Sequence, residues 1–329
     1  MTRSVKLLRR VAFLLILPCL IWSGYWAATA YALKKGVAIA GETQIPGLDA
    51  QFKLAALTGY PTRFDIGLTD ILLSADNSLT WVTEGVTADA KSYAPNAITL
   101  DLSQAHRLSG ALGTIDIDAA QAAITLLVQP NLRLPLGHLT IEASALNLTA
   151  PNSWRAHITA LLASFAPHPQ TPQTYQISAN VQALDLSDVL KHLPENYHVI
   201  QRVKVDGAVL LSGSLDRLVL ENGLPEARQI AVQNAQFDFG SAQISIAGQL
   251  AYDTAKTATG TLNISVEGWQ DLFQLAKDLG YVAPNLEGFF TTVLTDLDAQ
   301  DGMENSLTIP LTIQNDKISY GALNFGVLR

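Results

Sequence analysis

The chain has 329 residues, of which 48% are hydrophobic and only 15% are charged, whereas soluble domains usually carry about 25% charged residues. Its 29 acidic and 21 basic residues give a formal net charge of −8, which argues against binding nucleic acid or anionic headgroups through bulk electrostatics. Its single cysteine, Cys19, excludes an intramolecular disulfide, and the rest of the chain has no thiol chemistry.

An uncharged apolar run extends over residues 11–33, after a basic flank and before Lys34-Lys35. A membrane-spanning helix needs about 20 apolar residues, and the more basic flank stays in the cytoplasm. The run therefore predicts a single-pass membrane protein with a cytoplasmic N-terminus and an exported bulk. Aromatic residues suited to the far membrane interface gather in its second half: Trp22, Tyr25, Trp26 and Tyr31.

The predicted division of the chain is a cytoplasmic flank (1–10), a transmembrane helix (11–33), a linker (34–49) and an exported β-rich domain (50–329). A cleaved signal peptide is the alternative, because Ala28-Thr29-Ala30 has the small-x-small pattern of a cleavage site. Cleavage near Ala30 would release a soluble binding or adaptor module. The run exceeds the about 7–15 apolar residues of a typical signal core, which favours the uncleaved anchor.

Strand patterns begin directly after this segment. Residues 50–57 fit either a short helix or a strand. The tripeptide Gly59-Tyr60-Pro61 then predicts a sharp corner, because glycine adopts backbone conformations closed to other residues and proline fixes its own φ. Phe64, Ile66 and Leu68 follow in alternation with polar residues, which is the period of a half-buried strand.

Many short strands at a spacing of about ten residues predict a mainly β fold of the α+β class. We expect an extended, twisted and largely antiparallel sheet after one N-terminal transmembrane helix, with a few short amphipathic helices. The further strand-like segments are 98–102, 115–117, 139–148, 177–181, 203–211, 230–232, 237–239, 244–250, 262–266, 294–297 and 307–313.

Three helices are predicted among these strands: 154–165 after Asn152-Ser153, 187–193 before Pro194, and 269–279 before Gly280. The strand and helix patterns of residues 177–194 recur at 261–280, and each copy precedes a further strand-like segment, at 203–215 and at 286–299. This weak repeat predicts an extended array of strand–helix–strand units instead of a compact enzyme core. The exported domain is expected to divide into two strand–helix–strand halves, 50–170 and 171–329.

The residues that commonly carry chemistry do not cluster in the sequence. The six histidines are scattered, so neither a metal site nor a cofactor is expected. Asp296, Asp298 and Asp301-Gly302 resemble a calcium loop, but its twelfth position is Leu307 instead of glutamate, so a solvated acidic turn is predicted. We therefore expect no enzyme; a hydrolase with an unmarked carboxylate pair is the third alternative.

Apolar strand faces are the stronger indication. A long twisted sheet that folds over on itself leaves an apolar trough along one side, which suits acyl chains. A closed core made by the same side chains is the alternative. The residues expected to line such a groove are Phe64, Ile66, Leu68, Ile98, Leu100 and Leu102.

The motif Gly59-Tyr60-Pro61-Thr62-Arg63-Phe64 resembles the Gly-aromatic-Pro-x-Arg-aromatic strand start of a bacterial envelope family, domain of unknown function 2125. That family is also similar in its N-terminal membrane segment and in a C-terminal hairpin, matched here by residues 309–321. Asp316 and Asn324 depart from the glycine and proline of the family pattern. The resemblance implies structural roles for Gly59, Tyr60, Pro61, Arg63 and Phe64, and no catalytic residue.

The plan of an anchor, a Gly-x-Pro strand start and a long β-sheet is more distantly similar to AsmA-like envelope proteins. That likeness implies a bacterial inner-membrane protein with its bulk in the periplasm and a structural or lipid-handling role. The expected partners are the membrane and acyl lipids, without nucleic acid. A fold-level likeness does not determine function.

Overall fold

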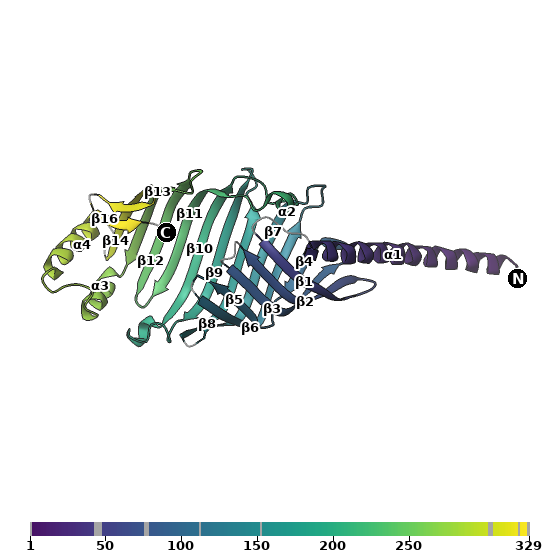
Figure 1. Ribbon diagram of the computed structural model, residues 1–329, viewed down its shortest axis with the longest axis horizontal. Helices are drawn as coiled ribbons and strands as arrows, with labels where there is room; N and C mark the ends of the chain where they lie inside the picture. Colours follow the sequence, from purple (N-terminus) through teal and green to yellow (C-terminus); the bar gives the residue numbers. More distant parts are fainter. Residues whose placement is uncertain are drawn as a thin grey trace.

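The computed structural model describes residues 2–42, 48–75, 79–111, 113–151, 153–301, 305–321 and 323–327 (Figure 1). A long helix, α1 (Thr2–Glu42), leaves one end of a large sheet, and α3 (Trp269–Asp278) and α4 (Glu287–Asp301) lie at the other end. Two shorter elements, η1 (Glu195–Tyr197) and α2 (Val219–Asn222), connect strands. The molecule is thus an elongated array of strands with helices at its two ends.

The described strands form one 16-stranded sheet, and all of their pairings are antiparallel. Strand order follows sequence order, except that β5 pairs with β3 and β6 beside β4. The strands are β1 (Leu48–Thr58), β2 (Arg63–Ala75), β3 (Leu79–Lys91), β4 (Ala94–Asp101), β5 (His106–Gly110), β6 (Gly113–Val128), β7 (Leu136–Ala150), β8 (Trp154–Pro167), β9 (Thr174–Asp185), β10 (Val199–Leu211), β11 (Ala227–Phe239), β12 (Ala242–Tyr252), β13 (Ala258–Glu267), β14 (Ser306–Gln314), β15 (Lys317–Tyr320) and β16 (Leu323–Val327).

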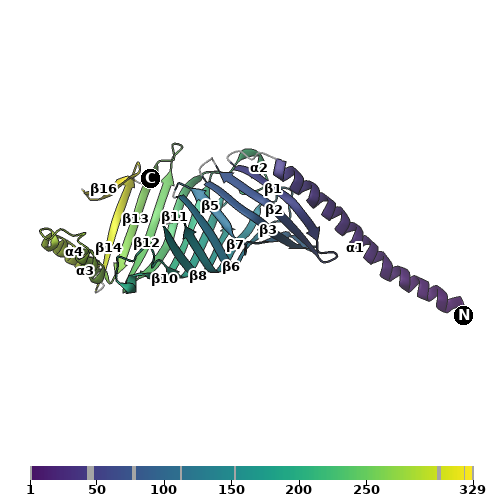
Figure 2. The same ribbon diagram turned by 60° about the horizontal axis from the view of Figure 1, so that its bottom comes forward.

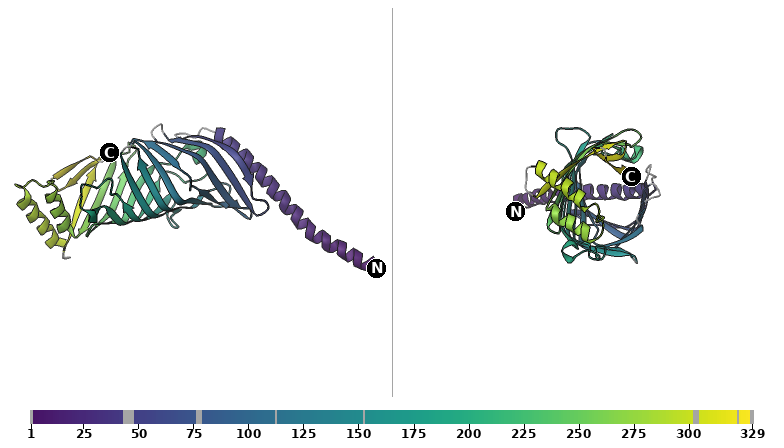
Figure 3. Two further views of the ribbon diagram at one scale, coloured as in Figure 1. Left: turned by 90° about the horizontal axis from the view of Figure 1, so that it is seen from below. Right: turned by 90° about the vertical axis from the view of Figure 1, so that its left-hand side faces the viewer.

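The sheet is strongly twisted and curved (Figure 2). Seen along the long axis, the strands follow an open arc (Figure 3), and β1 and β16 stand at the two ends of the strand order. The predicted fold class, a mainly antiparallel β protein preceded by an apolar helix, is confirmed. Residues 50–57, left open between helix and strand, belong to β1.

Helix α1 begins before the predicted transmembrane segment and continues to Glu42, so part of the predicted linker over residues 34–49 is helical. Residues 43–47 of that linker lie outside the described part of the chain. Within the described residues, Ile16–Ile39 is long and apolar enough to cross a membrane. The same length and composition also fit a signal sequence.

A line of irregular residues crosses the N-terminal half of the sheet, and we call it the phase-shift line. On it, Asp70, Ala145 and Ala183 have positive φ values of 54°, 48° and 48°. These residues, and the residues that face them on neighbouring strands, are left out of the regular strand pairing, which continues on either side of them. Such irregularities interrupt the two-residue alternation of side chains. The line consists of Asp70, Glu84, Ala120, Ala145, Thr159, Ala183 and Gln201.

The helix predicted at 154–165 is wrong, because these residues form strand β8. Asn152 of its predicted cap lies outside the described residues. The phase-shift line explains the error. Ile158 before the line and Leu161 after it pair with apolar residues of β7, and a step of three between apolar positions is also a helical signal.

The other predicted helices had mixed outcomes. The helix at 269–279 is confirmed as α3, which is followed by Gly280 in a left-handed conformation. The helix at 187–193 is wrong, because this segment forms a series of turns. The strand-like segments 294–297 and 286–299 are also wrong, since α4 occupies them. The two copies of the weak repeat therefore have different secondary structure.

The C-terminal hairpin of the predicted motif is present. Strands β14 and β15 pair from Gln314 and Lys317 outward. Asn315 and Asp316, which form the turn, have φ values of 50° and 64°, as a two-residue hairpin of the primed type requires. Asp316 thus takes the conformation for which glycine was expected. Backbone pairing of Asn324 with Ser319 places it on β16.

The chain exposes far more surface than a compact protein of its size. Its accessible area is 20596 Å² for 35.3 kDa, whereas a compact monomer of this mass exposes about 13,000 Å². The protruding α1 accounts for part of the excess. Among the described residues, the largest side chains that are fully buried are only Phe64, Ile313 and Ser92. The sheet therefore does not close around a conventional core.

Candidate functional site

The predicted motif forms the corner between β1 and β2, which we define as residues 59–64. Gly59 has a φ of +99°, and a Cβ at this position would lie 2.8 Å from both the carbonyl oxygen of Arg63 and Oδ2 of Asp65. The N–H of Arg63 donates to the carbonyl of Gly59 over 2.8 Å, and the Tyr60–Pro61 peptide bond is cis. The corner therefore requires glycine, as the sequence predicted.

This corner binds helix α1. The indole N–H of Trp22 donates to the carbonyl of Pro61 over 2.8 Å. One turn further along α1, the indole N–H of Trp26 donates to the carbonyl of Arg63 over 2.9 Å. Between them, the hydroxyls of Ser23 and Tyr60 lie 2.7 Å apart. The two indole N–H groups thereby find acceptors on the corner, as tryptophan N–H groups in contacts usually do.

A second turn extends the contact with α1. Ser92, which follows β3, donates its N–H to Thr62 over 2.9 Å and its hydroxyl to the carbonyl of Pro61 over 3.0 Å. Its own carbonyl accepts a hydrogen bond of 2.9 Å from the hydroxyl of Tyr25. Ser92 is fully buried. The two turns therefore form one binding surface for three successive aromatic residues of α1.

The last residue of the motif anchors the apolar side of this contact. The ring of Phe64 is fully buried and stacks on Trp26, with centroids 5.4 Å apart and planes at 20°. The ring of Tyr60 meets Trp26 edge-on at 5.3 Å. Arg63 points elsewhere, since its guanidinium pairs with Asp65 at 3.2 Å and with Asp89 at 3.1 Å. The five motif residues thus position α1 and the first strand.

Beyond Phe64, the strand registers align apolar residues into two continuous rows that cross the sheet from β2 to β14. We call these rows the apolar face. The first row is Phe64, Ala90, Ile98, Leu126, Leu139, Phe165, Ile177, Gly207, Val232, Gly248, Leu262 and Leu311, and the second is Ile66, Ala88, Leu100, Ile124, Ile141, Ala163, Ala179, Val205, Ala235, Ile246, Ile264 and Ile309.

The residues that face the other way form a polar row from β2 to β11. It consists of Asp65, Asp89, Thr99, Thr125, Thr140, Ser164, Ser178, Asp206 and Asn234. The sheet thus has one wet surface and one apolar surface over this length, as alternating side chains produce.

Most of the apolar face is half-buried. Phe64, Ala88 and Ala90 are buried, and the other members of both rows keep an intermediate exposure. The described helices make their main sheet contacts at the ends, where α1 meets β1, α3 meets β12 and α4 meets β14. Within the described chain, no element packs extensively over the middle of the face.

The six residues predicted to line a groove lie on this face or continue it. Phe64 and Ile98 share the first row, and Ile66 and Leu100 share the second. Leu68 pairs with Val86 beside them. Leu102 lies just beyond β4 and donates its N–H to the carbonyl of Ala122 over 2.8 Å. The register brings them together, and their role in binding stays a prediction.

Groups suited to catalysis or metal binding do not converge in the described residues, where no cluster of three histidine, cysteine, aspartate or glutamate residues is found. His106 is buried, and its Nε2 lies 2.8 Å from the carbonyl of Leu102. The acidic turn expected from Asp296 and Asp298 is wrong, because both lie in α4. Gly302 of that motif lies outside the described residues.

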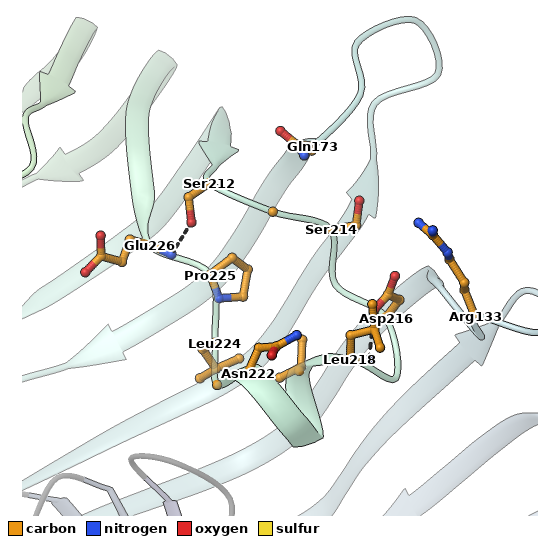
Figure 4. A pocket seen from close by; sticks show the side chains of 13 residues that line it. Arg133, Gln173, Ser212, Ser214, Asp216, Leu218, Asn222, Leu224, Pro225 and Glu226 are labelled. Carbon is orange, nitrogen blue, oxygen red and sulfur yellow. Dashed lines mark hydrogen bonds between the residues drawn. The ribbon is translucent and has the colours of Figure 1, made fainter.

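One polar pocket of about 450 Å³ lies among the loops at one edge of the sheet (Figure 4). Arg133 and Gln173 reach it from two loops, and the connection around α2 supplies the rest. Asp216 accepts the N–H of Leu218 over 2.8 Å, and Ser212 accepts that of Glu226 over 2.9 Å. The lining residues include no histidine or cysteine, and these hydrogen bonds stabilise the loops.

Comparison with known proteins gives one informative match. A family described as "Uncharacterized protein conserved in bacteria (DUF2125)" matches residues 26–329. No curated protein and no solved structure matches the chain.

Proposed function

The chain belongs to this family of uncharacterized bacterial proteins, and from that premise we propose that it is a non-enzymatic, inner-membrane-anchored protein of the cell envelope that binds acyl lipids. In this proposal α1 is the single anchor, the sheet lies in the periplasm, and the apolar face holds acyl chains. The observation that carries the proposal is the pair of apolar rows, over whose middle no element of the described chain packs extensively.

The length of the face suits long apolar ligands. Neighbouring strands lie about 4.8 Å apart, so the rows from β2 to β14 extend on the order of 50 Å, longer than the about 30 Å hydrocarbon core of a bilayer. The half-buried side chains of the two rows are numerous enough to contact an acyl chain along its whole length. Covering apolar surface contributes about 25 cal/mol per Å², which favours an acyl chain over water.

Small residues leave room in the middle of the face. Ala163, Ala179 and Ala235 occupy the second row. Larger side chains such as Phe165 and Ile141 stand beside them. A sheet built only to pack against another layer would gain more from large side chains at these positions.

Retention of α1 is supported by its contacts. Cleavage near Ala30 would remove Trp26, which stacks on Phe64 and donates to the carbonyl of Arg63. It would also remove Trp22, the partner of Pro61. The released domain would then expose Phe64 at the first position of the apolar face. N-terminal sequencing of the mature protein tests this point, because a start at Tyr31 would contradict an uncleaved anchor.

The lipid role is tested by matched variants of adjacent residues on opposite faces of β9. Ala179→Glu places a charge on the apolar face, whereas Ser178→Glu places it on the polar row. Full-length protein extracted from membranes is washed in lipid-free detergent, and co-purified acyl chains are measured by mass spectrometry. We expect at least a tenfold loss of bound lipid in Ala179→Glu and no change in Ser178→Glu.

A variant without a charge guards against misfolding. Ala179→Trp fills the middle of the face, and it should also reduce bound lipid while keeping the far-ultraviolet circular dichroism of the native chain. Absence of lipid from the native protein, or equal lipid in all variants, would contradict the proposal.

A further inference from the structure

The corner, the neighbouring turn at Ser92 and the part of α1 that binds them carry a group of partly exposed aromatic residues. Trp22 and Tyr25 of α1 are 36% and 40% exposed, and Tyr60 and Tyr93 of the turns are 57% and 67% exposed. Lys91 lies over the ring of Tyr93, with Nζ 5.9 Å from its centroid. Tryptophan and tyrosine with nearby lysine are the residues that membrane–water interfaces favour.

The bound position of α1 limits where a bilayer can lie. Residues 11–33 have Trp22 at their centre, so a span centred on this run would put Trp22 at the middle of the hydrocarbon. Trp22 is hydrogen-bonded to Pro61, and Arg63 with its partners Asp65 and Asp89 would follow it there. Charged groups in hydrocarbon are strongly disfavoured.

We propose that the outer surface of the bilayer lies at the corner, so that α1 enters the hydrocarbon only with the residues that precede Trp22, and that the leaflet touching the corner supplies acyl chains to the apolar face. The second part rests on the proposed function. The first part stands on the contacts of α1 alone.

The direction of the apolar rows agrees with this placement. The first row begins at Phe64, directly beneath Trp26, and it runs from the strands near α1 toward α3 and α4 at the other end (Figures 1 and 3). With the corner on the membrane, the face begins at the leaflet and leads away from it. An acyl chain that leaves the bilayer beside Trp26 therefore reaches the half-exposed part of the apolar face, which begins at Ile66 and Ile98.

The inserted part of α1 is short. Residues 11–21 are uncharged and extend about 16 Å at 1.5 Å per residue, roughly half of the about 30 Å hydrocarbon thickness. Such a mismatch is accommodated by thinning of the bilayer around the helix, and thinning beside the corner would ease the exit of a lipid.

Depth measurement separates the two placements. Ile16 and Ala28 are both exposed on α1 and lie six residues on either side of Trp22. Each is changed to cysteine in a Cys19→Ser background, labelled with a nitroxide, and studied in the full chain in phosphatidylethanolamine–phosphatidylglycerol vesicles. Collision with oxygen reports hydrocarbon, and collision with a water-soluble nickel chelate reports water.

We expect the label at residue 16 to meet oxygen and the label at residue 28 to meet the nickel chelate, with accessibility ratios that differ at least tenfold. The native chain labelled at Cys19 should lie shallower than residue 16. Equal ratios at 16 and 28, with Cys19 the deepest, would overturn the placement, as would nickel access at both positions. A preserved depth difference with no bound lipid would instead reject the proposed function and keep the placement.

Discussion

The corner and the apolar face both bury apolar side chains, but through different kinds of contact. At the corner, specific hydrogen bonds join aromatic side chains of α1 to backbone carbonyls of the two turns, and Phe64 is fully buried. Along the face, side chains of many sizes share only a direction, and most stay half-exposed. The difference indicates that the corner determines one geometry, whereas the face presents a general apolar surface. Substitutions should therefore be severe at the corner and graded along the face.

The largest effect is expected from Trp26→Ala. This change removes the stacking on Phe64 and the hydrogen bond to Arg63, and truncation of a packed tryptophan costs about 3–5 kcal/mol. Urea unfolding of the full chain in detergent measures the loss. Tyr31→Ala is the control on the same helix, because Tyr31 is 71% exposed and its truncation should change stability by less than about 0.5 kcal/mol. Equal effects would show that α1 is not held by the corner.

Gly59→Ala should follow, with a loss of about 2–3 kcal/mol from backbone strain and overlap with Arg63. Gly113→Ala is a matched control, because both glycines have a φ of +99° but a Cβ at Gly113 would meet nothing within 4 Å. The control should lose only about 1 kcal/mol. The difference between the two variants isolates the close approach at the corner, and no difference would remove that explanation of the motif.

The phase-shift line gives a smaller effect within the sheet. Ala183 has a φ of 48°, which a β-branched residue adopts poorly, so Ala183→Val should destabilise the protein by about 1–2 kcal/mol. Ala183→Gly should be neutral or stabilising by up to about 1 kcal/mol. Ala179→Val, on the apolar face of the same strand, lacks this strain. Thermal unfolding compares the three, and tolerance of Ala183→Val would argue against the line.

The smallest effect concerns pH at the end of β4. The hydroxyl and backbone N–H of Ser103 lower the pKa of Asp101 below its usual value. A carboxyl with a lower pKa in the folded state stabilises the protein above its unfolded pKa, and this contribution is lost as pH falls through the folded pKa. Asp101→Asn should therefore lose under about 1 kcal/mol at pH 7, and this difference from the native chain should disappear as the pH falls through the pKa of Asp101 in the folded state. A constant difference would contradict this.

The sequence predicted the strands well where alternation was regular, as at Phe64, Ile66 and Leu68, because a period of two has one structural interpretation. It failed at 154–165, where the phase-shift line displaces the alternation by one residue and imitates a helix. It also failed at 286–299, where apolar spacing fitted a strand but the segment forms α4.

The motif was found, but its partner was not. Gly59 and Pro61 predict a corner, because each has a distinctive backbone preference. The side chains that fill it, Trp22 and Trp26, lie in an apolar segment whose composition fits a membrane-spanning helix or a signal sequence. A pattern within one segment carries no information about its hydrogen bonds to another segment. The aromatic residues of α1 were therefore interpreted as a membrane-interface belt, and their contact with the corner was not predicted.

The open strand order also makes the sheet adjustable in length. Because most strands pair with their sequence neighbours, a hairpin inserted near the middle would extend both apolar rows by about 10 Å while leaving the corner and the distal helices unchanged. Deleting one would shorten them by the same step. The number of strands therefore sets the distance between the α1 end and the α3–α4 end of the sheet, and this distance can change in evolution without a new fold.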